Sequence, residues 1–382
     1  MQDVIEAARR LAPRIRAASD EIEAARRLPA DIADAMAEAR LLTLLSPANC
    51  GGADVDPLTA IRAVEQLGRA DGSVGWLATN SSYEAVFLAW LSPSTVERMR
   101  ASDRNIRMAG AIQPQGTAYA VDGGYRVSGH WDFVSGIVHA NWVSVGAFLL
   151  DGPGGERLRD ARGGTATRVF FMLPGDGRVV DHWDTMGMRG TGSHDFVVDD
   201  AFVPADQTMH ADEAPYADGP RYRLPFSKMW GWSLHGGNAL GIARGALEDL
   251  RVLSQHSASK VTPDLLRDRP HVQLAVGEAE AIVRAARAWL FEAAGAAWES
   301  AESEGADFDA REREAQLALM HAVHEAARAV GVLYDAVGTP AIFRANRLER
   351  AFRDLNVAKH HIAASRRHYQ AIGEAMLKGD GT

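Results

Sequence analysis

The sequence predicts an α+β protein in three parts: an N-terminal helical domain (1–105), a central antiparallel β-barrel or sandwich (106–215) and a C-terminal four-helix bundle (216–382). Two observations predict this order. Apolar residues recur with helical spacing at both ends of the chain, whereas short runs with strand-like alternation lie between them. Pro, Gly and Asp separate these short runs, as they do in all-β domains.

The N-terminal part carries the signals of successive helices. The stretch MQDVIEAARRLAPRIRAASDEIEAARR has Leu, Ile and Ala on one face and Arg and Glu on the other. Pro29 precedes a second helix, DIADAMAEARLL, and DPLTAIRAVEQLGRAD predicts a third. The stretch GSVGWLATNSSYEAVFLAWL is apolar on nearly all sides and predicts a buried helix, and SPSTVERMRAS predicts a short capped one.

The central part contains strand and turn signals. The stretch YAVDGGYRVSGHWDF has two runs around Asp122-Gly123-Gly124, which predicts a hairpin. Further strands are predicted at ANWVSVGAFLL, ATRVFFMLP and SHDFVVDDAFVP. After residue 226 the helical period returns, and the last of four long predicted helices spans 348–377. Their Ala-rich faces favour an antiparallel bundle.

Composition excludes several classes of protein. A net charge of −9 argues against nucleic-acid binding, which needs a basic face. The apolar stretches are too short for a membrane span of roughly 20 residues, and the N-terminus lacks a signal-peptide core. The single cysteine, Cys50, excludes an intramolecular disulfide and a Cys-based metal cage, and it suits a reducing, cytoplasmic setting.

Other common site motifs are absent from the sequence. No GxGxxG opens a strand–helix unit, and no Walker or GxSxG motif occurs. His321 and His324 are one helical turn apart with Glu325 beside them, but a second Glu-x-x-His partner is missing. We therefore expect a surface or packing role for this pair and no metal site.

Three segments together resemble the acyl-CoA dehydrogenase superfamily: residues 111–136, 185–204 (TMGMRGTGSHDFVVDDAFVP) and 336–361 (AVGTPAIFRANRLERAFRDLNVAKHH). They are most similar to its two-component flavin-dependent monooxygenases, the group D aromatic hydroxylases. The resemblance implies reduced flavin, FMN or alternatively FAD, from a separate NAD(P)H-flavin reductase. It also implies O2, a C4a-hydroperoxyflavin, a small aromatic or heteroaromatic substrate to be hydroxylated, and a homotetramer.

The flavin contacts are expected mainly in the first two segments. On a strand, Trp131, Phe133 and Ser135 would share one face with two aromatic surfaces and a hydroxyl. By resemblance, Phe133 stacks on the flavin ring and Ser135 lies near its N5 atom. Each group also has a purely structural interpretation. The strand at 131–135 could belong to the core, the turn at 190–193 could be an ordinary hairpin loop, and the arginines near 344 could be solvated at the surface. The full set of expected flavin contacts is Gln113, Trp131, Phe133, Ser135, Gly136, Thr191, Ser193 and, reaching a neighbouring subunit, Thr339 and Arg344.

The candidate base is a histidine. The catalytic glutamate of the dehydrogenases is missing after the Arg-Asp pair, and the monooxygenase branch has a histidine about seven residues after that aspartate. Counting from Asp354, this is His361, with His360 as the alternative if the register differs by one. The resemblance implies that it deprotonates a phenol-like substrate, which suits an imidazole pKa of about 6.5. A structural role for a lone helical histidine is the other interpretation.

The expected substrate contacts are His139, Tyr83, Trp230 and His235, with Trp232 beside them; a loop histidine and interface packing are the alternatives. Many relatives carry a histidine on the buried N-terminal helix, where this chain has Asn80, Tyr83 and Glu84. Two rival functions remain. One is an acyl-CoA dehydrogenase or oxidase, with a catalytic carboxylate near Glu248. The other is an inactive flavin-fold binding protein.

Overall fold

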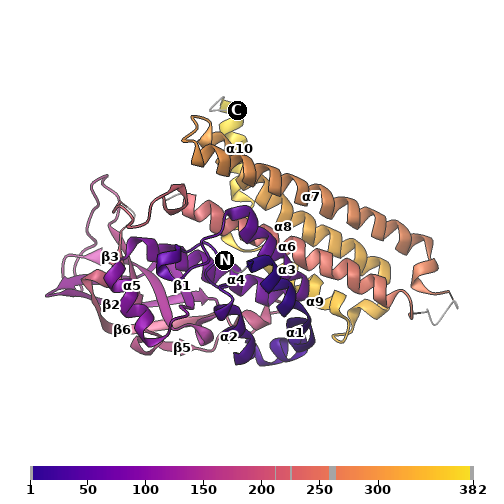
Figure 1. Ribbon diagram of the computed structural model, residues 1–382, viewed down its shortest axis with the longest axis horizontal. Helices are drawn as coiled ribbons and strands as arrows, with labels where there is room; N and C mark the ends of the chain where they lie inside the picture. The colour runs from indigo at the N-terminus through magenta and orange to yellow at the C-terminus, as the bar shows by residue number, and fades with distance from the viewer. Residues whose placement is uncertain (1–2, 211, 224–225, 258–263, 379–382) are drawn as a thin grey trace.

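Helices occupy both ends of the chain and one mixed sheet lies between them in sequence (Figure 1). This computed structural model describes residues 3–210, 212–223, 226–257 and 264–378. The strands and the long helices lie on opposite sides of the view, with α3 and α4 between them. No helix in these described ranges is both long and apolar enough to cross a membrane.

The N-terminal helices begin where the sequence predicts them because polar side chains cap their first turns. Asp3, Asp56, Asp71 and Ser92 accept hydrogen bonds from backbone N–H groups at the starts of α1, α3, α4 and α5. Helix α4 is buried on nearly all sides, as its apolar sequence predicts, and it packs against α3, α6 and β1. The five helices are α1 (Val4–Ala25), α2 (Ala30–Glu38), α3 (Pro57–Ala70), α4 (Gly72–Val86) and α5 (Pro93–Ser102).

The sheet follows the predicted hairpin but its strands are not all antiparallel. Its order is β5-β6-β2-β1-β3-β4-β7, and β1 and β3 run parallel. Strand β2 returns the chain to the start of β1, and the link 135–141 then crosses to the other side of β1, so β3 starts at the same end. The strands are β1 (Met108–Val121), β2 (Gly124–Val134), β3 (Trp142–Leu150), β4 (Thr167–Met172), β5 (Arg178–Val180), β6 (His194–Pro204) and β7 (Thr208–Met209).

The all-antiparallel arrangement predicted from the sequence is therefore wrong at β1 and β3. Strands β5 and β7 form the two edges, and within the described ranges no pairing joins them into a closed barrel. One apolar cluster fills the interior beside the sheet, and a larger one runs through the helices. Strand β1 lies at the centre of the sheet and touches α4, so it connects the sheet to the helical part.

The C-terminal helices pack against one another, but the last predicted helix is broken. Helix α8 packs on both α6 and α7, and α9 packs on α6 and α8. The predicted helix 348–377 ends at Ala358 and resumes at Arg367, with a turn between them. The helices are α6 (Phe226–Leu253), α7 (Pro270–Glu302), α8 (Phe308–Val337), α9 (Arg347–Ala358) and α10 (Arg367–Lys378).

Hydrogen bonds from other helices explain this break. Gln316 and His324 of α8 bind the carbonyls of Ala363 and Ala364 at 3.0 Å each, and His368 binds the carbonyl of Ile362 at 2.9 Å. These side chains thus give the carbonyls of the turn partners in place of the backbone N–H groups that a continuous helix would provide. His361 lies in the break, at the start of the short 3-10 helix Ile362–Ala364, and not on a helix as the sequence predicted.

Candidate active site

A cavity of about 490 Å³ lies where α4, α6, β1 and the turn after α9 meet. Its volume is typical of sites that hold small molecules and cofactors. Many predicted site residues line it, namely Tyr83, Gln113, Phe133, Ser135, Ser193, Trp232, His235, His360 and His361. It is also lined by residues to which the sequence assigned no site role, namely Trp76, Asn80, Glu84, Gln115, Asp132, Trp183 and Met188.

The predicted shared face of Trp131, Phe133 and Ser135 is wrong, because a bulge interrupts β2. The pairing with β6 shifts register between Trp131 and Val134, and Phe133 has a left-handed backbone with φ of 60°. Trp131 is fully buried inside the sheet and its Nε1 donates to the Gly146 carbonyl at 2.7 Å. The bulge turns the ring of Phe133 outward, 69% exposed and edge-on to Trp183 at 6.1 Å.

Ser135 belongs to a buried chain of hydroxyls beside the cavity. Ser135 Oγ lies 2.7 Å from Ser193 Oγ, which lies 2.7 Å from Thr191 Oγ1. Thr191 donates to the carbonyl of Met188 at 2.8 Å, so the proton of Ser193 points to Thr191 and that of Ser135 points to Ser193. Trp76 Nε1 donates to Ser135 at 3.2 Å. Thr191 thus supports the cavity wall from behind without lining it.

The Arg-Asp motif holds one side of the cavity in place. Asp354 is buried, and its Oδ1 accepts the backbone N–H of Met188 at 2.6 Å. Burial, with Asp71 nearby, raises the pKa of Asp354 to about 7. Arg353 pairs with Glu23 and Glu349. The motif therefore links α9 to the segment that contains Met188 and Ser193.

Two histidines and a tryptophan form an aromatic cluster in the cavity wall. The ring centroids of His235 and His361 are 4.1 Å apart, and Trp76 lies 4.6 Å from His235 and 5.2 Å from His361. Burial lowers the pKa of His361 to about 4, and burial together with the neighbouring His361 lowers that of His235 well below its usual value. Both imidazoles are therefore neutral at pH 7. His360, by contrast, is exposed at the cavity edge.

The hydrogen bond at His361 determines which tautomer the neutral ring adopts. Its Nδ1 accepts the backbone N–H of Ala363 at 3.2 Å, so the proton of the neutral ring lies on Nε2. In this geometry His361 presents a donor to the cavity. To act as a base through Nε2, the neutral ring would have to carry its proton on Nδ1. That proton would face the N–H of Ala363, so two donors would meet. The predicted role of a base stays a prediction, and the geometry favours a hydrogen-bond donor.

Helix α4 contributes a strip of side chains for which the sequence predicted no role in the site. Trp76, Asn80 and Glu84 are four residues apart and therefore share one face of the helix. Glu84 is only 5% exposed, and burial raises its pKa to about 7. The available signal was Glu84, an ionisable residue on a helix that the sequence predicts to be buried, because buried ionisable groups concentrate at functional sites.

Several predicted contacts lie outside this cavity. Trp230 is fully buried in the helical core, with its ring edge-on to Trp298 at 5.4 Å, so it cannot contact a substrate here. Thr339 and Arg344 are exposed in the connection between α8 and α9. Their expected contact with the flavin of a neighbouring subunit stays a prediction. Glu248 marks the region in which an acyl-CoA dehydrogenase would have its catalytic carboxylate. Its side chain forms an ion pair with Arg69 at 2.7 Å.

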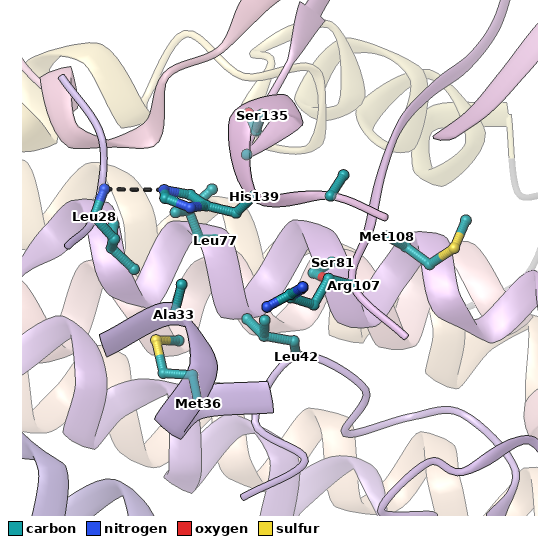
Figure 2. A pocket seen from close by; sticks show the side chains of 12 residues that line it. Leu28, Ala33, Met36, Leu42, Leu77, Ser81, Arg107, Met108, Ser135 and His139 are labelled. Atoms are coloured by element: carbon teal, nitrogen blue, oxygen red, sulfur yellow. Dashed lines mark hydrogen bonds between the residues drawn. The ribbon is translucent and has the colours of Figure 1, made fainter. Parts of the chain in front are cut away.

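His139 and Gly136 line a separate small cavity of about 20 Å³ (Figure 2). The Nε2 of His139 accepts the backbone N–H of Leu28 at 3.1 Å, which ties the chain before α2 to the link after β2. Burial lowers the pKa of His139 to about 4, consistent with a neutral acceptor. The expected substrate contact of His139 is therefore wrong, because this hydrogen bond holds the ring away from the larger cavity. Ser135 lines both cavities.

Comparison with protein families gives matches at both ends of the chain. Residues 2–92 match the acyl-CoA dehydrogenase N-terminal domain, and residues 233–366 match the acyl-CoA dehydrogenase C-terminal domain. These are the two regions in which the structure is helical.

Individual relatives match nearly the whole chain. Indole-3-acetate monooxygenase from Pseudomonas putida is 30% identical, over 96% of this chain and 91% of its own. The oxygenase subunit HsaA of a flavin-dependent monooxygenase from Rhodococcus jostii (strain RHA1) is 30% identical, over 92% of each chain. The crystal structure of 3-HSA hydroxylase from Rhodococcus sp. RHA1 superposes with a TM-score of 0.86 at 25% identity, covering 98% of this chain and 97% of that one.

Proposed function

The chain belongs to the acyl-CoA dehydrogenase superfamily, in its flavin-dependent monooxygenase branch, and we propose that it is an oxygenase component that hydroxylates a small aromatic or heteroaromatic substrate. The observation that carries this proposal is the cavity in which the exposed ring of Phe133, the hydroxyl of Ser135 and the neutral imidazole of His361 come together. This combination suits a flat, amphipathic ring and an aromatic substrate beside it.

The described residues fit a flavin. The proton of Ser135 is directed to Ser193, so the remaining lone pair of its Oγ is free to accept the N5–H of a reduced flavin. Phe133 and Trp183 offer aromatic surfaces, and Gln113 offers amide groups at the edge. When bound, reduced flavin supplies the activation of O2. FMN is the proposed form, with FAD as the alternative.

The protein's own groups orient the substrate and keep water away. His361 donates a hydrogen bond from Nε2 to an oxygen atom in the cavity, and burial beside the tilted ring of His235 keeps the imidazole of His361 neutral. The aromatic and aliphatic wall, including Trp76, Met188 and Ile112, limits the access of water to the reacting atoms. Tyr83 extends this wall on α4 and contacts the substrate.

The proposal also covers the partners and the assembly. A separate NAD(P)H-flavin reductase supplies the reduced flavin in this proposal, and the relative from R. jostii is likewise named as an oxygenase subunit. We propose a homotetramer in which Thr339 and Arg344 meet the flavin of a neighbouring subunit. The domain boundaries at residues 105 and 215 and the cytoplasmic location belong to the same proposal.

The proposed function is tested by measuring how much of the oxidised flavin yields hydroxylated product and how much yields H2O2. The protein is supplied with FMN, a flavin reductase and NADH in air, and the hydroxylated product of indole or phenol is quantified against released H2O2. We expect product from the wild type. Ser135→Ala should shift the yield toward H2O2 about tenfold, because the flavin loses its acceptor at N5. Ser128→Ala is the matched control, since that hydroxyl accepts the Asp200 N–H outside the cavity.

Other outcomes would favour the rival functions. If every aromatic compound yields only H2O2, and acyl-CoA bleaches the bound flavin without oxygen, the protein is a dehydrogenase or oxidase. If neither reduced nor oxidised flavin binds in equilibrium dialysis, it is a binding protein that has lost its chemistry.

A further inference from the structure

The side chain of Glu84 is held in place by neighbouring residues at the wall of the cavity. Its Oε2 accepts a hydrogen bond from Ser144 Oγ at 2.5 Å, and Ser144 is fully buried on β3. Gly110, the parallel partner of Ser144 on β1, leaves room for this pair, because a Cβ at that position would lie 2.5 Å from Glu84 Oε2. Three elements, α4, β1 and β3, thus combine to hold one carboxyl group.

The carboxyl keeps one oxygen for a ligand. Among the described residues, none hydrogen-bonds to Glu84 Oε1, although the side chain lines the cavity. Oε1 is not among the fully enclosed unpartnered atoms, so it is open to the cavity and can accept a hydrogen bond from a ligand there. The architecture therefore provides a hydrogen-bond acceptor at this end of the cavity.

Glu84 lies far from the groups beside the flavin position. Trp76 contacts both Ser135 and His361, and Glu84 follows it by eight residues on the same face of α4. At about 1.5 Å of rise per residue, this separation is about 12 Å along the helix. A substrate that reacts near Ser135 and His361 therefore directs its remote end toward Glu84.

The charges in the cavity wall are negative or neutral. Glu84 and Asp132 contribute carboxyl groups, and His235 and His361 are neutral at pH 7. Within the part of the chain that the structure describes, the lining contains neither Arg nor Lys. A carboxylate on the substrate would be desolvated here without a cation to pair with, which is unfavourable. An ammonium, amide or hydroxyl group would instead find an acceptor.

We propose that Glu84 determines specificity by accepting a hydrogen bond from a donor group at the remote end of the substrate. The cavity then selects cationic or uncharged aromatic compounds over aromatic carboxylates. This inference rests on the proposed function, and it differs from what the name of the indole-3-acetate monooxygenase indicates for that relative.

Three indoles that differ in one side chain test the inference: tryptamine, indole-3-acetamide and indole-3-acetate, which are cationic, neutral and anionic at pH 7.5. Their binding to the FMN-saturated protein is measured by titration calorimetry, and product formation is measured with the reductase present. We expect wild type to bind tryptamine at least tenfold more tightly than indole-3-acetate. Glu84→Gln should reduce this ratio at least tenfold and change the affinity for the amide less than threefold.

The control and the contrary outcomes are equally specific. Glu248→Gln makes the same chemical change outside the cavity, and it should leave the ratio unchanged. A wild type that binds indole-3-acetate as tightly as tryptamine overturns the inference, even if the Glu84 variant does not fold. An unchanged ratio in folded Glu84→Gln also overturns it. If calorimetry shows the expected ratio but only H2O2 is formed, the proposed hydroxylation has failed and the role of Glu84 in binding stands.

Discussion

At the scale of single residues, the bond from the Ala363 N–H to Nδ1 of His361 decides what this imidazole can do. Because Nδ1 is an acceptor, Nε2 carries the proton of the neutral ring and is a donor. The burial that lowers the pKa to about 4 keeps the ring in this neutral form at every pH above about 5. His361 therefore contributes a directed N–H and not a positive charge.

Amide substitutions separate the two roles of His361. The amide nitrogen of Gln can replace the Nε2–H donor, whereas the amide of Asn can replace the Nδ1 acceptor that caps the turn. We expect His361→Gln to retain kcat/KM within about tenfold of wild type. His361→Asn should lose roughly 100-fold, the scale typical of a positioned polar group. Equal losses in both variants would contradict the assignment of His361 as a donor through Nε2.

The pH profile gives an independent check on the same residue. The ring is already neutral above about pH 5. We therefore expect that titration of His361 does not lower kcat/KM near pH 6.5, and that wild type and His361→Gln have the same pH profile in that range. An inflection near 6.5 that disappears in this variant would mean that the ring titrates at its ordinary pKa and that burial does not dominate.

At the scale of elements, the break between α9 and α10 sets the position of His361. Gln316 on α8 donates to the Ala363 carbonyl, so a residue outside the cavity holds the turn that carries the imidazole. Gln316→Met keeps the length of the side chain and removes the donor. We expect a loss of about 1 kcal/mol in stability and a several-fold fall in kcat, with flavin affinity unchanged. The melting temperature, kcat and the flavin Kd measure these effects.

Glu314→Gln is the control for that prediction. It alters an exposed ion pair with Arg311 on the same helix, two residues away, and such pairs contribute little to stability. A fall in kcat of equal size in this variant would attribute the effect to α8 as a whole and not to the bond with Ala363.

The elements were predictable from the sequence where the signal is local. Caps such as Asp56 and Ser92, and the Asp122-Gly123 turn, act through neighbouring residues, and they predicted α3, α5 and the β1–β2 hairpin correctly. The parallel pairing of β3, the bulge at Phe133 and the turn at His361 depend on partners far away in the chain. Local periodicity contains no information about those partners.

The same distinction applies to the site. The order of the motifs predicted that Phe133, Ser135 and His361 meet, and they line one cavity. It did not predict the burial of Trp131 and Trp230, which depends on how the sheet and helices pack. Glu84 was visible as a polar residue on a buried helix. Its role was not visible, because the room left by Gly110 and the hydroxyl of Ser144 come from two separate strands.

At the scale of the whole molecule, two sets of buried groups make opposite contributions to the pH dependence of stability. Glu84 and Asp354 have folded-state pKa values of about 7, so between about pH 4 and 7 the folded state holds protons that the unfolded state has released. Their contribution to stability falls as the pH rises. His139 and His361 have lowered pKa values, so they stabilise the folded state above pH 6.5 and lose that contribution as the pH falls toward 4.

Removing one acid should alter this balance in a known direction. Glu84→Gln cannot ionise, so its melting temperature relative to wild type should rise between pH 5 and pH 8. The limiting difference corresponds to about 3 kcal/mol, from a shift of roughly two pKa units. Differential scanning calorimetry at the two pH values measures it. A difference that is constant with pH, or that falls as the pH rises, would contradict the burial of an ionisable carboxyl at this position.

Cys50 is the only cysteine in the chain and is buried, and burial raises its thiol pKa to about 11. The natural protein should therefore react slowly with maleimides at neutral pH, because the thiolate is the reactive form. Arg344→Cys would then add one accessible thiol in the exposed connection between α8 and α9. A dye attached there would report, by energy transfer between labelled copies, whether that connection approaches a second chain.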